Sequence, residues 1–503
     1  MCKKNRNFAA DFILHHCVHT CMIKTTDIQN FFFLGIGGIG MSGLARYFHH
    51  RGYPVAGYDR TPSALTKELE KEGIEIIYGD DQLEIGDWKL KLFPKHTLVV
   101  RTPAVPEQNS IYTYLRENGF DIRKRAEVLG LVTHGMRALC VAGTHGKTTT
   151  STMLAHLLYQ SEIGTNAFLG GISMNYGTNI LLQKDSSYVV VEADEYDRSF
   201  HQLKPYMSVI TAVDPDHLDI YSTPEAYRDA FAHYTSLITN TLVIKQGLDL
   251  QPRLKKGVKC YTYGVLEDAS FVLENYDIVP MEGKELPNFF ASNIRVKNGQ
   301  IYFDFHVEIP GTVATTIADL RLGVPVWVNI ENAVAAMAVA WLNGVTEDEL
   351  RHGILTFRGV QRRFNIHVNT PRVAYIDDYA HHPQEIATAI DSIRKLFPKR
   401  RLIGVFQPHL YTRTRDFAEQ FKAVLGTLDE CILLPIYPAR EEPIPGVTSE
   451  MLGEQVVQKA DLIDELKKRV AESTQPVVLL TVGAGDIDRL VPDVTKAFKN
   501  LKS

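Results

Sequence analysis

Seven consecutive residues, GTHGKTT (143–149), form a candidate phosphate-binding loop. The loop follows the apolar run ALCVA (138–142), and the residues after it predict a helix from about Lys147. Glycines let backbone N–H groups wrap around a phosphate, and a helix N-terminus adds positive potential. Lys147 is then placed to reach the terminal phosphates, and Thr148 to bind Mg²⁺. A complete P-loop has a glycine at the position of Val141, so this loop is a shortened variant.

Two acidic clusters lie at the ends of the next two predicted strands, SYVVVEAD (187–194) and MSVIT (207–211). Their members are Glu192, Asp194 and Glu195 in the first, and Asp214, Asp216, His217 and Asp219 in the second. The carboxyl ends of parallel strands meet at the sheet edge where ligands bind. Carboxylates are hard oxygen donors suited to Mg²⁺. Each cluster alone fits ordinary solvated acids equally well, but beside a phosphate loop they favour a nucleotide site with magnesium.

An earlier glycine-rich loop, GIGGIGMSG (35–43), also lies between a predicted strand and a predicted helix. Such a loop suits a pyrophosphate held on backbone amides. Asp59 ends the second predicted strand, where acids that bind a ribose occur. NAD is the obvious alternative ligand. The loop at Lys147 argues instead for two different nucleotides, one of them the energy source.

Predicted strands and helices alternate along most of the chain, which indicates an α/β fold with parallel sheets. We expect a Rossmann-like N-terminal domain (31–135), a central P-loop ATPase domain (136–358) and a Rossmann-like C-terminal domain (359–503). Within the central domain, residues 258–325 alternate in polarity and predict β-hairpins added to the parallel sheet. The length of 503 residues agrees with about three domains.

The composition is that of an ordinary globular protein, with 45% hydrophobic and 22% charged residues. The chain has no apolar stretch of the roughly 18 residues that a membrane span requires. Its net charge of −5 does not predict nucleic-acid binding. Six cysteines without a CxxC pair or zinc-type spacing predict free thiols and a cytoplasmic protein.

The first 21 residues differ from the rest of the chain. They start with basic residues, and Asp11, His15 and His16 interrupt any apolar segment, so a secretory signal is not expected. We expect a poorly ordered extension over 1–30, or a start codon assigned too far upstream of Met22.

From about residue 31 to residue 503, the sequence resembles the Mur ligases. The motifs that carry the resemblance are LGIGGIGMSGLA, AGTHGKTTT, EADEYDRSF, DPDHLDIY, NIENAVAA, GVQRRF, DDYAHHP and FQPHLYTRTRD. It implies an ATP- and Mg²⁺-dependent ligase that couples L-alanine to the lactyl carboxylate of UDP-N-acetylmuramate. The carboxylate attacks the γ-phosphate to give an acyl phosphate and ADP, and the amine then displaces phosphate.

The resemblance also implies three binding sites, which correspond to the three domains. The implied ATP site consists of Gly143, Thr144, His145, Gly146, Lys147, Thr148, Thr149, Asn329, Asn332, Arg363, Asp377 and Asp378. The implied UDP-sugar site consists of Gly35, Gly37, Gly38, Gly40, Met41, Ser42, Asp59, Thr102, Asn175 and Asn179. The implied amino-acid site consists of Tyr379, His382, His409, Tyr411, Arg413 and Arg415. The implied catalytic residues are Lys147, Glu192, His217 and Arg413, and the implied metal ligands are Thr148, Glu192 and His217.

The chain departs from the family pattern at two positions. Val328 stands where the family usually has histidine, and Leu410 where many relatives have arginine. The second change removes one possible carboxylate contact and favours Arg413 for that role. The alternative for Arg413 and Arg415 is that they pair with nearby acids such as Asp416. The alternative for His217 is that it is a hydrogen-bonding core residue.

Three other functions compete with this interpretation. A murein tripeptide ligase of cell-wall recycling uses the same sugar nucleotide, but DDYAHHP and FQPHLYTRTRD favour a small amino acid. A dinucleotide oxidoreductase leaves Lys147 and the acids unexplained, and a catalytically inactive binding module does not require them. We expect a monomer or homodimer that neither binds nucleic acid nor inserts into a membrane.

Overall fold

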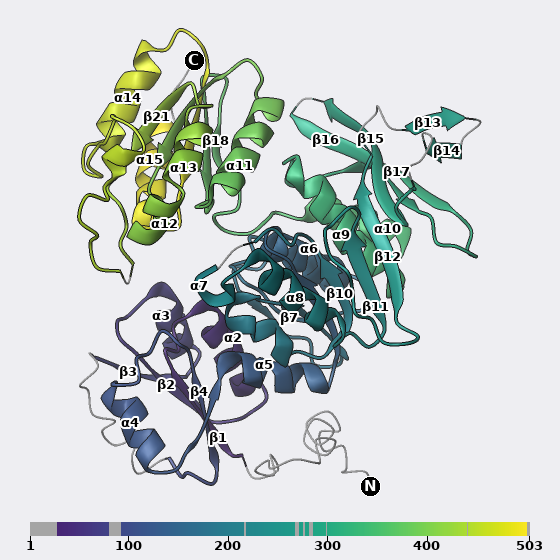
Figure 1. Cartoon of the computed structure of the whole chain (residues 1–503), viewed down its shortest axis with the longest axis vertical. Helices are drawn as coiled ribbons and strands as arrows, with labels where there is room; N and C mark the ends of the chain where they lie inside the picture. Colours follow the sequence, from purple (N-terminus) through teal and green to yellow (C-terminus); the bar gives the residue numbers. More distant parts are fainter. Residues whose placement is uncertain are drawn as a thin grey trace. The chain divides into compact units, whose positions relative to one another are not determined.

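The computed structural model (Figure 1) describes residues 28–79, 92–215, 218–266, 271–274, 277–280, 285–297, 299–439 and 441–499. The predicted N-terminal extension lies outside these residues except for 28–30, and Asn30 already belongs to the first strand. The chain forms two compact units. The first comprises residues 1–292, 305–318 and 332–356, and the second comprises 293–304, 319–331 and 357–503. Among the described residues, no helix has the length and apolar character needed to cross a membrane.

The N-terminal domain is a five-stranded, wholly parallel sheet in the order β3-β2-β1-β4-β5. Its elements are β1 (Asn30–Leu34), α2 (Ile39–His50), β2 (Val55–Asp59), α3 (Ala64–Lys71), β3 (Glu75–Tyr78), β4 (Thr97–Arg101), α4 (Ser110–Glu117), β5 (Asp121–Lys124) and α5 (Arg125–His134). The apolar runs of β1 and β4 are buried on both faces, as in sheets that helices cover on both sides. The carboxyl ends of β1, β2 and β4 therefore meet at one edge, beside the first glycine loop.

The central domain is built on a ten-stranded sheet in the order β17-β16-β15-β12-β11-β10-β6-β9-β7-β8. Its strands are β6 (Arg137–Ala142), β7 (Asn166–Phe168), β8 (Ile180–Leu181), β9 (Tyr188–Glu192), β10 (Pro205–Ile210), β11 (Thr241–Lys245), β12 (Lys259–Val265), β15 (Phe289–Lys297), β16 (Gln300–Val307) and β17 (Thr315–Arg321). Its helices are α6 (Lys147–Tyr159), α7 (Leu218–Tyr221), α8 (Pro224–Thr235), α9 (Val328–Leu342) and α10 (Glu347–Thr356). β6 lies between β9 and β10, so the strand before the Lys147 loop is flanked by the strands that carry both acidic clusters.

The β-rich part of the central domain contains an antiparallel hairpin, as predicted, and in addition it extends the parallel sheet. β12 pairs in parallel with both β11 and β15, so the parallel sheet continues beyond β11. β13 (Phe271–Glu274) and β14 (Asp277–Pro280) pair with each other as an antiparallel hairpin. Alternating polarity shows that a strand has one buried face, but the direction of its partner depends on the connection before it.

The C-terminal domain has a five-stranded sheet in the order β18-β19-β22-β20-β21. Its elements are β18 (Asn365–Asn369), β19 (Val373–Asp378), α11 (Pro383–Leu396), β20 (Arg401–Phe406), α12 (Tyr411–Asp416), α13 (Ala418–Leu425), β21 (Glu430–Leu433), α14 (Leu462–Glu472), β22 (Val477–Val482) and α15 (Val491–Phe498). Four strands are parallel, and β18 is added antiparallel to β19. The α/β, three-domain prediction is thus confirmed, with mixed sheets in the central and C-terminal domains.

The N-terminal and central domains share one hydrophobic core. α2 packs on β7 and β8, and α5 packs on β6, so both helices lie between the two sheets (Figure 1). The rings of Tyr47 in α2 and Phe168 in β7 lie 5.4 Å apart at their centroids. Full burial of one large apolar side chain stabilises the folded state by roughly 1.5–3 kcal/mol. The two glycine loops are therefore parts of a single packed unit.

Candidate active site

Two glycines shape the loop between β6 and α6. Gly143 has φ +138°, and a Cβ there would lie 2.1 Å from Thr211 Oγ1 and 2.8 Å from the Ala212 nitrogen. Gly146 has φ +81° and directly precedes the first residue of α6. Any side chain at Gly143 would collide with the end of β10, and both backbone conformations favour glycine. The loop thus needs glycine for its geometry as well as for access to a phosphate.

Lys147 is folded back on its own loop. Its Nζ donates to the carbonyl oxygens of Gly143 (2.6 Å) and Thr144 (3.2 Å) and to Glu195 Oε1 (2.8 Å). Burial alone would lower the pKa of Lys147, but nearby carboxylates, with Glu195 foremost, outweigh it and raise that pKa. The side chain is therefore a partly buried ammonium, 14% exposed. To bind a nucleotide phosphate it must exchange the two loop carbonyls for phosphate oxygens.

Glu195 is the main residue that sequence reasoning did not single out. It was one of three acids in the cluster after β9, and nothing in the sequence separated it from Glu192. Its side chain is 2% exposed, and burial raises its pKa to about 7 although Lys147 opposes the shift. Its backbone carbonyl accepts a short hydrogen bond from the Tyr221 hydroxyl. The structure thus makes Glu195 the charge partner of the phosphate-loop lysine.

Thr148 and Glu192 lie side by side, as a shared metal would require. The Thr148 hydroxyl donates to Glu192 Oε1 at 3.1 Å. Gly170 leaves room for this carboxylate, because a Cβ on Gly170 would lie 2.0 Å from Glu192 Oε2. A hydroxyl and a carboxylate are oxygen donors that fit Mg²⁺, which usually completes its shell with waters and substrate phosphates. The described residues contain no group of three His, Cys, Asp or Glu that could hold a metal alone.

The remaining predicted ATP residues of the first unit surround this loop. The Thr144 hydroxyl donates to the Asp214 carbonyl oxygen at 2.7 Å, and the His145 carbonyl oxygen accepts from the Thr211 hydroxyl at 2.5 Å. Asn332 Oδ1 accepts from the hydroxyl of Thr150, the residue after Thr149 in α6, at 3.1 Å. His217 and Asp216 lie outside the described residues, as does the side chain of Asp219.

The first glycine loop is held by the second and fourth strands. Asp59 Oδ2 accepts a hydrogen bond from the Gly37 amide at 2.7 Å. Gly35 has φ +82° and passes so close to Thr102 that a Cβ would lie 2.5 Å from its methyl group. Gly38 caps α2, and the first amides of a helix lack intrahelical partners. The loop can therefore bind an anion, while Asp59 supports its backbone.

Four predicted UDP-sugar residues have side chains that are engaged elsewhere. Met41 and Ser42 are 2% and 0% exposed in the core beneath α2. The Asn179 amide donates to the Ile39 carbonyl oxygen at 2.6 Å, and Asn175 donates to the Thr356 carbonyl oxygen at 2.9 Å. Asn179 also accepts from Arg46, which links the loop before β8 to α2. The side chain of Asn179 therefore joins the N-terminal domain to the central domain.

In the second unit, Arg362 and Arg363 have different environments. Arg362 donates to the carbonyl oxygens of Gly483 (2.5 Å) and Gly485 (3.3 Å), so it fixes the loop after β22. Both guanidinium groups lie 5.1 Å from the centroid of the Tyr379 ring. Burial raises the pKa of Asp378 to about 6, although the positive charge of Arg363 acts to lower that pKa. Arg363 thus lies near both Tyr379 and Asp378.

The two predicted aspartates at the end of β19 are both bound internally. Asp377 is 1% exposed and accepts from the Thr481 hydroxyl at 3.1 Å. Asp378 accepts from the backbone amides of Phe364 and Ala380, each at 2.7 Å. Asn329, at the start of α9, donates to the Val324 carbonyl oxygen at 3.4 Å. The contacts of Asp377 and Asp378 arrange the backbone around the carboxyl end of β19.

The predicted amino-acid residues lie on the loops that follow β19 and β20 and in helix α12. The His382 side chain caps α11, and the rings of His409 and Tyr437 stack with centroids 5.9 Å apart. Leu410 has φ +70° before α12, and its amide donates to the Tyr437 carbonyl oxygen. Glu441 accepts from the Thr412 amide at 3.0 Å and from its hydroxyl at 2.5 Å. Sequence reasoning missed Tyr437 and Glu441, which brace the turn that begins at His409 and continues through Tyr411.

The two arginines of α12 are not equivalent. Arg415 pairs with Asp416 at 2.7 Å, and 51% of its side chain is exposed. Arg413 is half-buried, and no described carboxylate forms an ion pair with it. The expected alternative, pairing with Asp416, therefore holds for Arg415. Arg413 remains the guanidinium that a substrate carboxylate could use.

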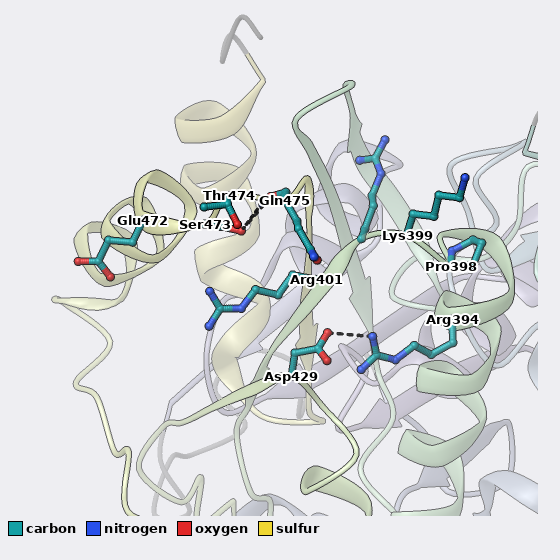
Figure 2. A pocket seen from close by; sticks show the side chains of 10 residues that line it. Arg394, Pro398, Lys399, Arg401, Asp429, Glu472, Ser473, Thr474 and Gln475 are labelled. Carbon is teal, nitrogen blue, oxygen red and sulfur yellow. Dashed lines mark hydrogen bonds and ion pairs between the residues drawn. The ribbon is translucent and has the colours of Figure 1, made fainter.

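A cavity of about 680 Å³ lies away from all of these residues, at the amino ends of β20 and β22 (Figure 2). It is rich in arginine and lysine, but Arg394 pairs with Asp429 at 2.8 Å, as the dashed line shows. Arg400 donates to the Thr370 carbonyl oxygen, and Arg401 pairs with Glu430. The arginines thus satisfy strand and loop carbonyls and neighbouring acids. None of the predicted site residues lines this cavity.

Known proteins resemble this chain along most of its length. Three family models match in order: "Mur ligase family, catalytic domain" at 30–137, "Mur ligase middle domain" at 141–340 and "Mur ligase, glutamate ligase domain" at 362–485. A UDP-N-acetylmuramate–L-alanine ligase of Phocaeicola vulgatus is 51% identical over 482 residues, which cover 94% of this chain and 98% of that protein. The enzyme of the same name from Parabacteroides distasonis is 54% identical over 471 residues, with coverage of 92% and 96%.

Solved structures give the same result. The crystal structure of a UDP-N-acetylmuramate-alanine ligase from Thermotoga maritima superposes with a TM-score of 0.71 at 26% identity, covering 94% of this chain and 100% of that one. A murein peptide ligase from Psychrobacter arcticus has a TM-score of 0.61 at 21% identity, with coverage of 94% and 100%. The second likeness concerns the fold alone.

Proposed function

This chain belongs to the Mur ligase family, and from that premise we propose that it ligates L-alanine to UDP-N-acetylmuramate at the expense of ATP. The reaction supplies a precursor of peptidoglycan. The observation that carries the proposal is about 50% identity to enzymes of this name over nearly the whole chain. The phosphate loop at Lys147 supplies the chemistry that such a ligase needs.

Amide formation from a carboxylate requires a leaving group on the acyl carbon. A lactyl carboxylate oxygen attacks the γ-phosphorus of ATP, and the bond from that phosphorus to the bridging oxygen of ADP breaks. The amine of L-alanine then attacks the acyl carbon, phosphate leaves with the electron pair, and the nitrogen loses a proton. Two anions must meet in the first step, so neutralising charge is the main task of the site.

Lys147 is the residue of this chain best placed for that task. It is a partly buried ammonium whose present partners are two loop carbonyls and Glu195. A bound phosphate would replace the carbonyls, while Glu195 would hold the ammonium from the other side. Glu195 is thus a positioning residue for the lysine. Its burial keeps water from competing with the phosphate for Nζ.

Thr148 and Glu192 would hold Mg²⁺ beside the phosphate loop, since their oxygens already meet at 3.1 Å. When bound, the ion neutralises charge on the transferred phosphoryl group. His217 is proposed as a ligand of a second metal, on the resemblance of DPDHLDIY alone.

The other two substrates are assigned to the loops described above. The diphosphate of the sugar nucleotide is assigned to the loop from Gly35 to Gly40, where α2 begins. The carboxylate of L-alanine is assigned to Arg413, because guanidinium binds carboxylates in a bidentate manner. These roles correspond to domains at 31–135, 136–358 and 359–503. We place the enzyme in the cytoplasm, as a monomer or homodimer.

Phosphate release measured with ATP, Mg²⁺, UDP-N-acetylmuramate and one amine at a time tests the proposal. We expect release with L-alanine to depend on all substrates, and mass spectrometry to show UDP-N-acetylmuramoyl-L-alanine. Glycine and L-serine define the selectivity. Faster turnover with the tripeptide L-alanyl-γ-D-glutamyl-diaminopimelate than with L-alanine would indicate the recycling ligase instead.

A further inference from the structure

Arg125 lies at the ligand-binding edge of the N-terminal sheet, although no sequence motif drew attention to it. It is the first residue of α5 and directly follows β5. Because β5 is parallel to β4 and β4 to β1, the start of α5 lies on the same edge as the loop after β1. Ligands bind at this edge in open parallel sheets.

The guanidinium group of Arg125 rests against the first turn of α2. A Cβ on Gly40 would lie 2.4 Å from Nη1 and 3.1 Å from Cζ. Side chains of a helix tilt toward its N-terminus, so the space that glycine leaves open at this position faces the start of α2. The positive group therefore occupies the region where the diphosphate is assigned.

Arg125 has little else to neutralise it. Among the residues that the structure describes, its one ion pair joins Nη2 to Asp194 Oδ2 at 3.3 Å, and the two side chains are 30% and 40% exposed. Within the described ranges, none of the other N–H groups of this guanidinium makes a hydrogen bond. A single, long, half-exposed pair contributes little to stability. The guanidinium thus keeps donors for a further anion.

The place of this arginine is unfavourable without a ligand. The N-terminus of a helix carries partial positive charge, so cations are disfavoured there and anions favoured. Arg125 lies at the N-terminus of α5 and against that of α2. An anion bound between the guanidinium and the amides of α2 would relieve both repulsions.

We propose that Arg125 binds the diphosphate of the sugar nucleotide, together with the backbone amides at the start of α2. This rests on the proposed function, which it deepens by naming a side chain that recognises a nucleoside diphosphate. Through Asp194, the same guanidinium connects that diphosphate to the segment carrying Glu192 and Glu195. The sugar nucleotide and the ATP-side carboxylates thus share one contact within the first unit.

A neighbouring residue provides a matched control. Lys124 pairs with Asp197 at 2.8 Å, and both side chains are about half exposed. Lys124→Gln therefore removes one positive charge and one ion pair between the same two segments, one residue away from Arg125. Asp194→Asn breaks the ion pair of Arg125 but leaves its guanidinium in place.

Calorimetric titrations with UDP-N-acetylmuramate, UDP and UMP test the proposal on the full chain. We expect Arg125→Gln to weaken UDP-N-acetylmuramate binding by about tenfold or more, or about 1.4 kcal/mol. It should also remove most of the preference for UDP over UMP, while ATP affinity stays unchanged. Lys124→Gln and Asp194→Asn should shift these affinities less than about threefold, and Arg125→Lys should lie between. Melting temperatures show whether each variant is folded.

Two results would overturn the proposal. Arg125→Gln could weaken binding no more than Lys124→Gln, in which case general charge accounts for the effect. Asp194→Asn could weaken binding as much as Arg125→Gln, in which case the ion pair matters and the phosphate contact does not. A wild-type protein that fails to bind UDP-N-acetylmuramate would refute the proposed function itself, which is a distinct outcome.

Discussion

Replacing Arg413 by alanine should raise the KM for L-alanine while leaving the affinities for ATP and UDP-N-acetylmuramate almost unchanged. The half-buried guanidinium forms no ion pair with a described carboxylate, so a substrate carboxylate would meet it without displacing a protein partner. A charged hydrogen bond contributes about 1.5–3 kcal/mol. Since about 1.4 kcal/mol is tenfold, we expect KM to rise roughly tenfold to a hundredfold.

The matched comparison is Arg415→Ala, a substitution two residues further along α12. Arg415 already pairs with Asp416 and is half-exposed, and such pairs contribute about 0–1 kcal/mol. Its removal should change the KM for L-alanine less than about fivefold. Both variants are assayed by phosphate release with L-alanine and with L-alanine amide, which lacks the carboxylate. The amide should be a poor substrate for the wild type and should lose far less on Arg413→Ala. Equal losses for both amines, or an equal effect of Arg415→Ala, would refute the reasoning.

Three further predictions concern the phosphate loop, the N-terminus and a buried histidine. Lys147→Ala should lower kcat by orders of magnitude in the phosphate-release assay while the Kd for UDP-N-acetylmuramate changes less than about twofold; normal turnover would exclude the lysine from catalysis. A chain that starts at Met22 should keep full activity and melting temperature, and a loss of several degrees would show that residues 1–21 are packed. Burial lowers the pKa of His156 from 6.5 to about 4, so the folded state binds fewer protons than the unfolded state between these values. Stability is then complete above pH 6.5 and falls as the pH drops toward 4, by about 2 kcal/mol between pH 7 and 5. Urea unfolding of His156→Gln should show a smaller decline, and an unchanged decline would mean that other groups cause it.

Local features of the chain were predictable because they depend on residues close in sequence. β4 begins and ends where the apolar run TLVVR does, and α6 begins at Lys147 directly after its glycine. Glycine loops between a strand and a helix have a conformation set largely by their own backbone, so both loops could be read from sequence. The resemblance to the Mur ligases, which rested on these short motifs, is confirmed by the family models.

The sequence by itself therefore determined the order of the elements, the two glycine loops and the family, because each depends on patterns within a few residues. Only the tertiary structure decided which of three neighbouring acids pairs with Lys147, since Glu195 lies 48 residues away on another strand end. It likewise assigned Arg362 to the carbonyls after β22, placed Arg125 on Gly40, and continued the parallel sheet through β12. Charge partners and strand directions depend on distances between residues far apart in the chain, and packing of the sheets and helices sets those distances.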